Sequence, residues 1–172
     1  MPRRYRRRNY KLTRPVKITK YSNETFASAA IKTFLNNQVY YSPCIPATQI
    51  LGTRKVKNFT LTLAHSGTPT MTDNILFFAL IYVPEGTTPN QIHFGSTWDQ
   101  QNPTILSTTS FYEPNQNIIL QGFIDSHQVY RFKTRLARNL NSGDMIVLAW
   151  APFKDYDGDA FFSYTLNYAM AY

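Results

Sequence analysis

The stretch ILFFALIYV, residues 75–83, consists of nine consecutive apolar or aromatic residues, and turn-forming residues lie on both sides of it. It is far shorter than the roughly 20 residues that a membrane-spanning helix needs. A short apolar run of this kind is typical of a β-strand that is covered on both faces. The run IVLAWA at residues 146–151 has the same character. The sequence therefore predicts strands buried between two layers.

Outside these two runs the apolar residues alternate with polar ones. Phe59, Leu61 and Leu63 alternate with threonines, and residues 162–170 alternate through an uncharged segment. In residues 129–136 the side chains of Phe132, Thr134 and Leu136 alternate with three cations. A period of two predicts strands with one buried face. Residues 117–124 form a further strand candidate.

The segment 23–35 is compatible with either a helix or a strand. Ala27, Ile31 and Leu35 have helical spacing after a plausible N-cap at Asn23, whereas Thr25 and Thr33 suit a strand. We favour the strand, because a sandwich built from the other strands needs one more. With turn signals between the segments, the sequence predicts an all-β fold of about eight strands, an eight-stranded jelly-roll sandwich over residues 16–172.

One stretch breaks the alternation. Lys55 and Lys57 have the same parity as Phe59 and Leu61, which would place two cations on a buried face. Either a β-bulge follows the lysines or their end of the strand lies outside the core. Both interpretations remain open at this stage.

The positive charge lies almost entirely at the N-terminus. The chain of 172 residues has a net charge of +8, yet residues 21–172 contain nine cations and all ten acids, a net charge of −1. No acid precedes Glu24. The first 20 residues contain the other nine cations: Arg3, Arg4, Arg6, Arg7, Arg8, Lys11, Arg14, Lys17 and Lys20.

Residues 1–15 have no apolar periodicity, so we expect a basic N-terminal arm that is disordered without a partner. Arginine keeps its proton and binds phosphate with a planar fork, which suits neutralisation of nucleic acid. Tyr5 and Tyr10 lie among the cations and could stack on unpaired bases. A nuclear localisation signal or a solvated tail is the alternative, and the first is compatible with nucleic-acid binding.

A second basic strip is a candidate site on the folded domain. It comprises Arg131, Lys133 and Arg135 on one strand face, with Arg138 beyond them. An exposed face and a second nucleic-acid contact explain this strip equally well.

The remaining polar motifs favour no enzyme, metal site or cofactor. Cys44 is the only cysteine, and it lies between prolines like a packed apolar side chain. His65, His93 and His127 are too far apart for a cupin metal site. Asp155, Asp157 and Asp159 alternate as in part of a calcium loop but lack its bidentate glutamate, so an acidic surface turn is favoured over a site for a cation or for a neighbouring subunit's arginine.

Three segments resemble capsid proteins of circovirus-like, Rep-encoding circular single-stranded DNA (CRESS-DNA) viruses. They are IPATQILGTRKVKNF at residues 45–59, YVPEGT at 82–87 and RLARNLNSGD at 135–144, and the arginine-rich arm fits the same pattern. The resemblance implies a jelly-roll shell domain, an icosahedral T=1 homo-oligomer of roughly 60 copies, and an interior arm that contacts packaged single-stranded DNA. It further implies a virion protein that enters the host nucleus through the import machinery and inserts into no membrane.

The main alternative is a non-viral β-barrel that binds single-stranded nucleic acid and has a basic tail. Such a protein usually exposes cations and aromatic residues on the folded surface itself. The net charge of −1 after residue 20 favours the capsid interpretation. DNA rather than RNA as the cargo is implied by the resemblance alone.

Overall fold

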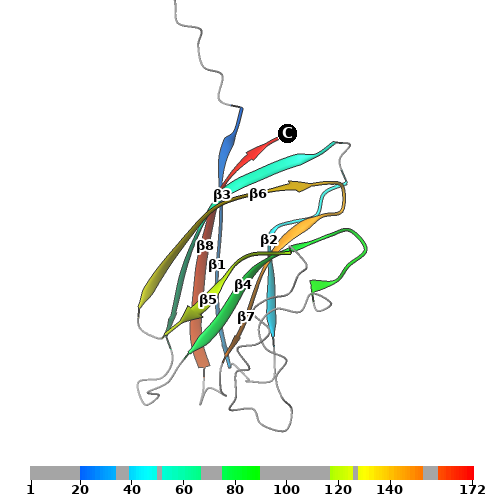
Figure 1. The fold of residues 1–172 in the computed structure, drawn as a ribbon. Helices are drawn as coiled ribbons and strands as arrows, with labels where there is room; N and C mark the ends of the chain where they lie inside the picture. Colours follow the sequence, from blue (N-terminus) through cyan, green and yellow to red (C-terminus); the bar gives the residue numbers. More distant parts are fainter. Residues whose placement is uncertain are drawn as a thin grey trace, which may run out of the picture.

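The computed structural model describes residues 20–33, 39–49, 52–66, 75–89, 117–125, 128–152 and 159–172. These residues form eight β-strands (Figure 1). The strands are β1 (Ser22–Thr33), β2 (Tyr40–Ile45), β3 (Arg54–Ser66), β4 (Leu76–Val83), β5 (Ile118–Ile124), β6 (Val129–Leu140), β7 (Met145–Pro152) and β8 (Asp159–Ala171).

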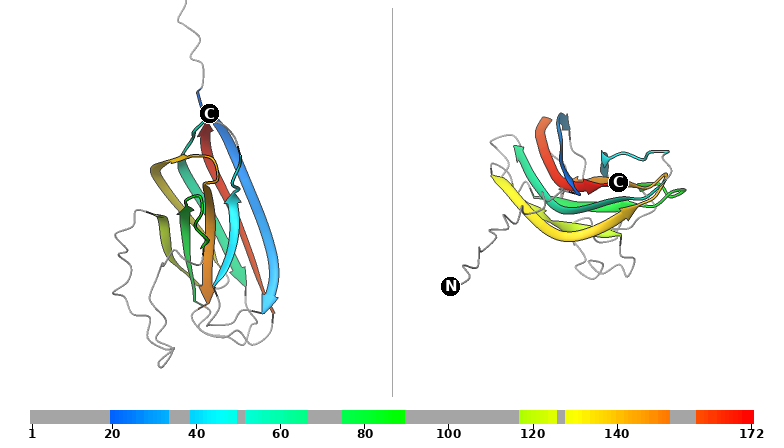
Figure 2. Two further views of the ribbon diagram at one scale, coloured as in Figure 1. Left: turned by 90° about the vertical axis from the view of Figure 1, so that its right-hand side faces the viewer. Right: turned by 90° about the horizontal axis from the view of Figure 1, so that it is seen from above.

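The strands form two antiparallel sheets of four. Sheet A has the order β1-β8-β3-β6 and sheet B the order β2-β7-β4-β5. Sequence neighbours therefore mostly lie in different sheets, and the first strand pairs with the last. This order is that of a jelly roll, so the predicted fold is confirmed. The strands of sheet A are the longer set, and their curvature is clearest from above (Figure 2).

Residues 23–33 of the ambiguous segment 23–35 form most of strand β1, and residues 34 and 35 lie outside the described residues. The strand pairs with β8 in an unbroken register from Ser22 opposite Met170 to Thr33 opposite Asp159. Phe26 packs against the core, whereas Ala27 and Ile31, which suggested a helix, lie on the outer face. Ile31 is 70% exposed. Pairing with β8 therefore decides the structure of this segment.

Strand β4 is buried on both faces, as the apolar run predicts. Phe78 and Leu80 lie in the main core between the sheets, together with Leu148 and Trp150 of β7. Phe77, Ala79 and Ile81 belong to a second buried cluster with Val147 and Ala149, on the other face of sheet B. This double burial explains why β4 and β7 lack alternation in the sequence.

Strand β2 was not predicted from the sequence. It is short, contains Pro43, and within the described part of the chain lies at the edge of sheet B with β7 as its one partner. Proline cannot donate a ladder hydrogen bond, so it is confined to edges and bulges. The register of β2 shifts between Pro43 and Ile45, and both Cys44 and Ile45 are buried.

The two lysines of β3 precede a bulge at Asn58. The register with β6 shifts between Lys57 and Phe59, and the register with β8 shifts between Lys57 and Thr60. Asn58 has φ of 57°, in the left-handed region that asparagine tolerates. Val56 and Phe59 are both fully buried, so Lys57 and Asn58 lie between two inward-facing residues. The bulge interpretation is therefore confirmed.

Candidate nucleic-acid interface

The outer face of sheet A, which points away from sheet B, collects most of the cations of the folded domain. Arg131, Lys133 and Arg135 alternate with the inward-facing residues of β6, and all three are exposed. Lys55 and Lys57 of β3 occupy the same face, because buried Val56 lies between them. Five of the nine cations after residue 20 therefore share one face, although the net charge of that part of the chain is −1.

Uncharged polar residues lie beside these cations. Thr62 pairs with Arg131 and Thr60 with Lys133 across β3 and β6. The second pair continues across the sheet, since Asn167 of β8 lies opposite both Thr60 and Thr25. Thr25 Oγ1 donates a hydrogen bond of 2.7 Å to Asn167 Oδ1. The cations therefore border a hydrogen-bonding surface, with no carboxylate in this row.

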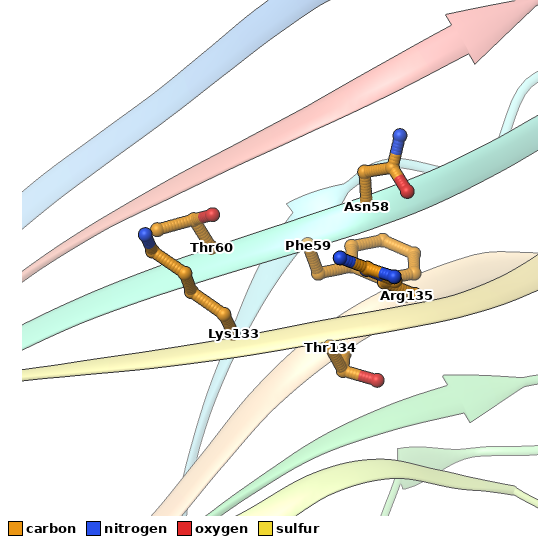
Figure 3. Close-up of a pocket in the computed structure, with 6 residues that line it drawn as sticks. All are labelled: Asn58, Phe59, Thr60, Lys133, Thr134 and Arg135. Carbon is orange, nitrogen blue, oxygen red and sulfur yellow. The ribbon is translucent and has the colours of Figure 1, made fainter.

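A pocket opens between β3 and β6 at the bulge (Figure 3). It has a volume of about 460 Å³ and is lined by Asn58, Phe59, Thr60, Lys133, Thr134 and Arg135. In Figure 3 the amino group of Lys133 reaches toward Thr60, its partner across the sheet, while Asn58 and Arg135 lie at the other end of the pocket. Phe59 is fully buried, so it forms part of the floor.

The chain enters sheet A at the cationic end of this face. Lys20 is exposed, and Tyr21 follows it immediately before β1. The Lys57 Nζ lies 3.7 Å from the centroid of the Tyr21 ring, which is a cation–π contact. The start of β1, the start of β3 and the C-terminus lie together at this end, the top of Figure 1.

The remaining predicted arm residues lie outside the described residues. They are Arg3, Arg4, Tyr5, Arg6, Arg7, Arg8, Tyr10, Lys11, Arg14 and Lys17.

Arg138 does not extend the strip of Arg131, Lys133 and Arg135. It pairs with Val56, whose side chain is fully buried, so Arg138 lies on the inward side of β6. Its positive charge lowers the pKa of the Tyr82 hydroxyl of β4, but burial and the neighbouring Asp144 raise that pKa by more. The structure thus brings three of the four predicted cations together and adds Lys55, Lys57 and Asn58.

A buried polar cluster at the turn before β7 was not predicted. The carboxylate of Asp144, a residue only 3% exposed, accepts hydrogen bonds from the Asn141 backbone N–H (2.7 Å), the Glu85 backbone N–H (3.0 Å) and the Tyr82 hydroxyl (2.8 Å). Arg54, 4% exposed, donates to the carbonyl oxygens of Pro46 and Asp144, both at 3.3 Å. The cluster joins both sheets, which indicates a structural role.

The other polar candidates do not assemble into a site among the described residues. Burial raises the pKa of the Cys44 thiol to about 12, so the thiol rather than the nucleophilic thiolate is present at neutral pH. His65 is buried in β3, whereas His93 and His127 lie outside the described residues. Asp159 is exposed at the start of β8, and Asp155 and Asp157 also lie outside the described residues.

Neither a metal cluster nor a membrane span is found in the described segments. No group of three or more His, Cys, Asp or Glu side chains there could hold a metal ion. The same segments contain no helix of the length and apolar character needed to cross a bilayer.

Comparison with known proteins gives similarity at the level of structure alone. No protein-family model and no curated protein matches the chain. Among solved structures, the cyanophage Pam1 capsid asymmetric unit is similar over 98% of this chain and 99% of that chain, with 11% identity and a TM-score of 0.42. Decameric BFDV capsid protein is similar over 87% and 97%, with 9% identity and a TM-score of 0.40. Both are capsid proteins, but the fold assignment rests on the strand order rather than on these similarities.

Proposed function

We propose that this chain is a viral coat protein that assembles into a small icosahedral shell, T=1 with about 60 copies, around circular single-stranded DNA. The arginine-rich arm neutralises the nucleic acid inside the shell, and the jelly-roll domain forms the wall. The arm also directs the subunit to the host nucleus through the import machinery. DNA, its circular form and the nuclear step follow the resemblance of the sequence to CRESS-DNA virus capsid proteins.

The separation of charge between arm and jelly roll is the observation that carries this proposal. Nine cations and no acid lie in the first 20 residues, whereas the rest of the chain has a net charge of −1. A nearly neutral domain can pack against copies of itself without strong repulsion. About 60 arms would contribute on the order of 540 positive charges, enough to offset a large share of a small genome's phosphates.

The strand order bears on the alternative function. An oligonucleotide-binding barrel has five strands in a partly open barrel, whereas the described residues of this chain form two sheets of four in jelly-roll order. The cations on the outer face of sheet A are a feature that a non-viral nucleic-acid-binding protein would share. Particle formation therefore separates the two functions, because binding of nucleic acid alone does not.

The arm is tested by changing its charge while keeping its length. In one variant the five arginines at positions 3, 4, 6, 7 and 8 become glutamine, and in the matched control they become lysine. Particles of the glutamine variant should contain much less nucleic acid, seen as a lower ratio of absorbance at 260 nm to that at 280 nm. The lysine variant should remain close to wild type, because it retains the charge. Equal nucleic-acid content in wild-type and glutamine particles would contradict the packaging role.

A further inference from the structure

The β3 bulge creates a polar hollow that an unbroken strand would lack. A regular strand places alternate residues on each face, but here Lys57 and Asn58 both lie between the buried residues Val56 and Phe59. The bulge shifts the register of β3 against both of its neighbours. Asn58 is exposed and borders a pocket on either side of β3. Bulges commonly re-aim side chains at binding sites.

Charge distinguishes the two pockets that share Asn58. The pocket toward β6 has a volume of about 460 Å³ and includes Lys133 and Arg135. The pocket toward β8 and β1 is smaller, about 270 Å³, and the described residues that line it include Glu24 but no cation. An anion therefore favours the pocket toward β6.

We propose that the pocket between β3 and β6 binds one backbone phosphate of a nucleic-acid strand, independently of base sequence. Lys133 and Arg135 supply the positive charge, and the Asn58 amide and the Thr60 hydroxyl supply hydrogen-bond donors. The choice of nucleic acid as the source of the phosphate rests on the proposed function. Two adjacent cations with neutral donors suit a phosphodiester, since phosphate contacts position a strand without identifying its bases.

The distribution of charged and apolar residues over the outer face of sheet A indicates the direction in which a nucleic-acid strand would cross it. The cationic end of sheet A adjoins Lys20, where the chain enters β1. The far end is apolar, because it has three large exposed hydrophobic residues, Ile31, Phe161 and Val129. Ile31 pairs with Phe161, and Val129 pairs with Ala64. Asp159, which pairs with Thr33, also lies at that end. A nucleic-acid strand held by the arm would therefore reach the bulge pocket first. It would leave this face of sheet A before the apolar end of the face.

The test measures binding of a fluorescein-labelled 20-nucleotide oligo-dT to the full-length chain, kept dilute, over a range of salt concentrations. Lys133→Ala/Arg135→Ala should weaken binding on the order of tenfold at ~0.1 M salt and reduce the slope of log K against log[salt] by about 0.7, the value for one lost phosphate contact on a single strand. Asn58→Gly, which fits the positive φ, should weaken binding about threefold without changing the slope, because the amide is uncharged.

A charge-relocation variant provides the matched control. Lys133→Ala/Arg135→Ala combined with Ala27→Lys/Ala29→Lys restores the net charge on exposed positions of β1, on the same face. Its affinity should stay close to that of the double-alanine variant, and recovery to wild-type affinity would overturn the proposed site. All substituted side chains are exposed, so the circular dichroism spectra and melting temperatures should match those of the wild type.

The outcomes separate this site from the function on which it rests. Suppose that the wild-type chain forms particles and that the double-alanine variant binds oligo-dT as tightly as the wild type. This result would overturn the proposed phosphate site and leave the coat-protein proposal intact. Weakened binding by that variant, with a wild-type chain that forms no particles, would support the pocket and contradict the coat-protein proposal. Oligo-dA should bind within about threefold of oligo-dT, and a larger preference would contradict recognition of the backbone.

Discussion

At the scale of single residues, the buried carboxylate of Asp144 connects several segments of the fold through hydrogen bonds. Its carboxylate accepts from two backbone N–H groups and from the Tyr82 hydroxyl, and these donors belong to three separate turns and strands. Removing a buried acceptor leaves its donors without a partner, and that loss costs more than the net contribution of each hydrogen bond. Asp144 therefore holds the turn before β7 in place against β4.

We predict that Asp144→Ala lowers the free energy of unfolding by about 3 kcal/mol, whereas Tyr82→Phe, which removes one of the three donors, lowers it by about 1 kcal/mol. Thr53→Ala is the control, because its hydroxyl donates to Asn141 Oδ1 in an exposed position of the same region and should cost less than ~0.5 kcal/mol. Urea unfolding followed by tryptophan fluorescence measures all three. Equal effects of Asp144→Ala and Thr53→Ala would show that the buried carboxylate is dispensable.

Tyr82 also gives the fold a dependence on alkaline pH. Burial, and then the hydrogen bond and negative charge of Asp144, raise its pKa from 10.0 to about 12. Because the folded-state pKa is above the unfolded value, this contribution to stability is complete below pH 10 and is lost as the pH rises from 10 toward 12. In a spectrophotometric titration, the phenolate absorbance of the Tyr82→Phe variant is subtracted from that of the wild type. The difference should rise near pH 12. A step near pH 10 would contradict the burial of this hydroxyl.

At the scale of elements, the bulge in β3 depends on a residue that tolerates positive φ. We predict that Asn58→Gly changes the free energy of unfolding by less than ~0.5 kcal/mol and that Asn58→Val lowers it by about 1–2 kcal/mol, because a β-branched residue is strained in the left-handed region. Thr60→Val, on the same face of the same strand, is the control for β-branching. If Asn58→Val were as stable as wild type, the bulge would have to lie elsewhere.

The elements that the sequence predicts well are those in which burial and periodicity agree. The apolar run of β4 and the alternation of β6 each predict a strand, because every residue but one of β4 is buried and Tyr130 and Phe132 of β6 pack against the core. The predicted inward position of Leu136 is wrong, since this side chain is 45% exposed next to the bulge. Strand β2 escaped prediction, because its ladder is short and interrupted by Pro43. For β1 the helical spacing of Ala27 and Ile31 was misleading, since both residues lie on the outer face and pairing with β8 determines the conformation.

The candidate site was predictable only in part. The alternation of Arg131, Lys133 and Arg135 is visible in the sequence, and the parity of Lys55 and Lys57 indicates an irregularity in β3. That these two features meet follows from the pairing of β3 with β6, which brings Thr60 opposite Lys133. Arg138 shows the limit of the sequence pattern, because its partner Val56 places it on the inward side of the strand.

At the scale of the whole molecule, charge is separated twice. The first separation is along the sequence, between a basic N-terminus and a domain with a net charge of −1. The second is in space, because five of the nine cations after residue 20 lie on the outer face of sheet A, on strands β3 and β6. In the proposed shell this face would accompany the arm toward the nucleic acid, and other surfaces would remain available for contacts between subunits.

Assembly is the central claim, and sedimentation of the purified full-length chain, with electron microscopy of the same sample, tests it most directly. The account predicts closed particles of uniform size and a mass of about 60 subunits of 19.9 kDa, on the order of one megadalton. A chain that remains a stable monomer at high protein concentration, with nucleic acid present and at low salt, would contradict it.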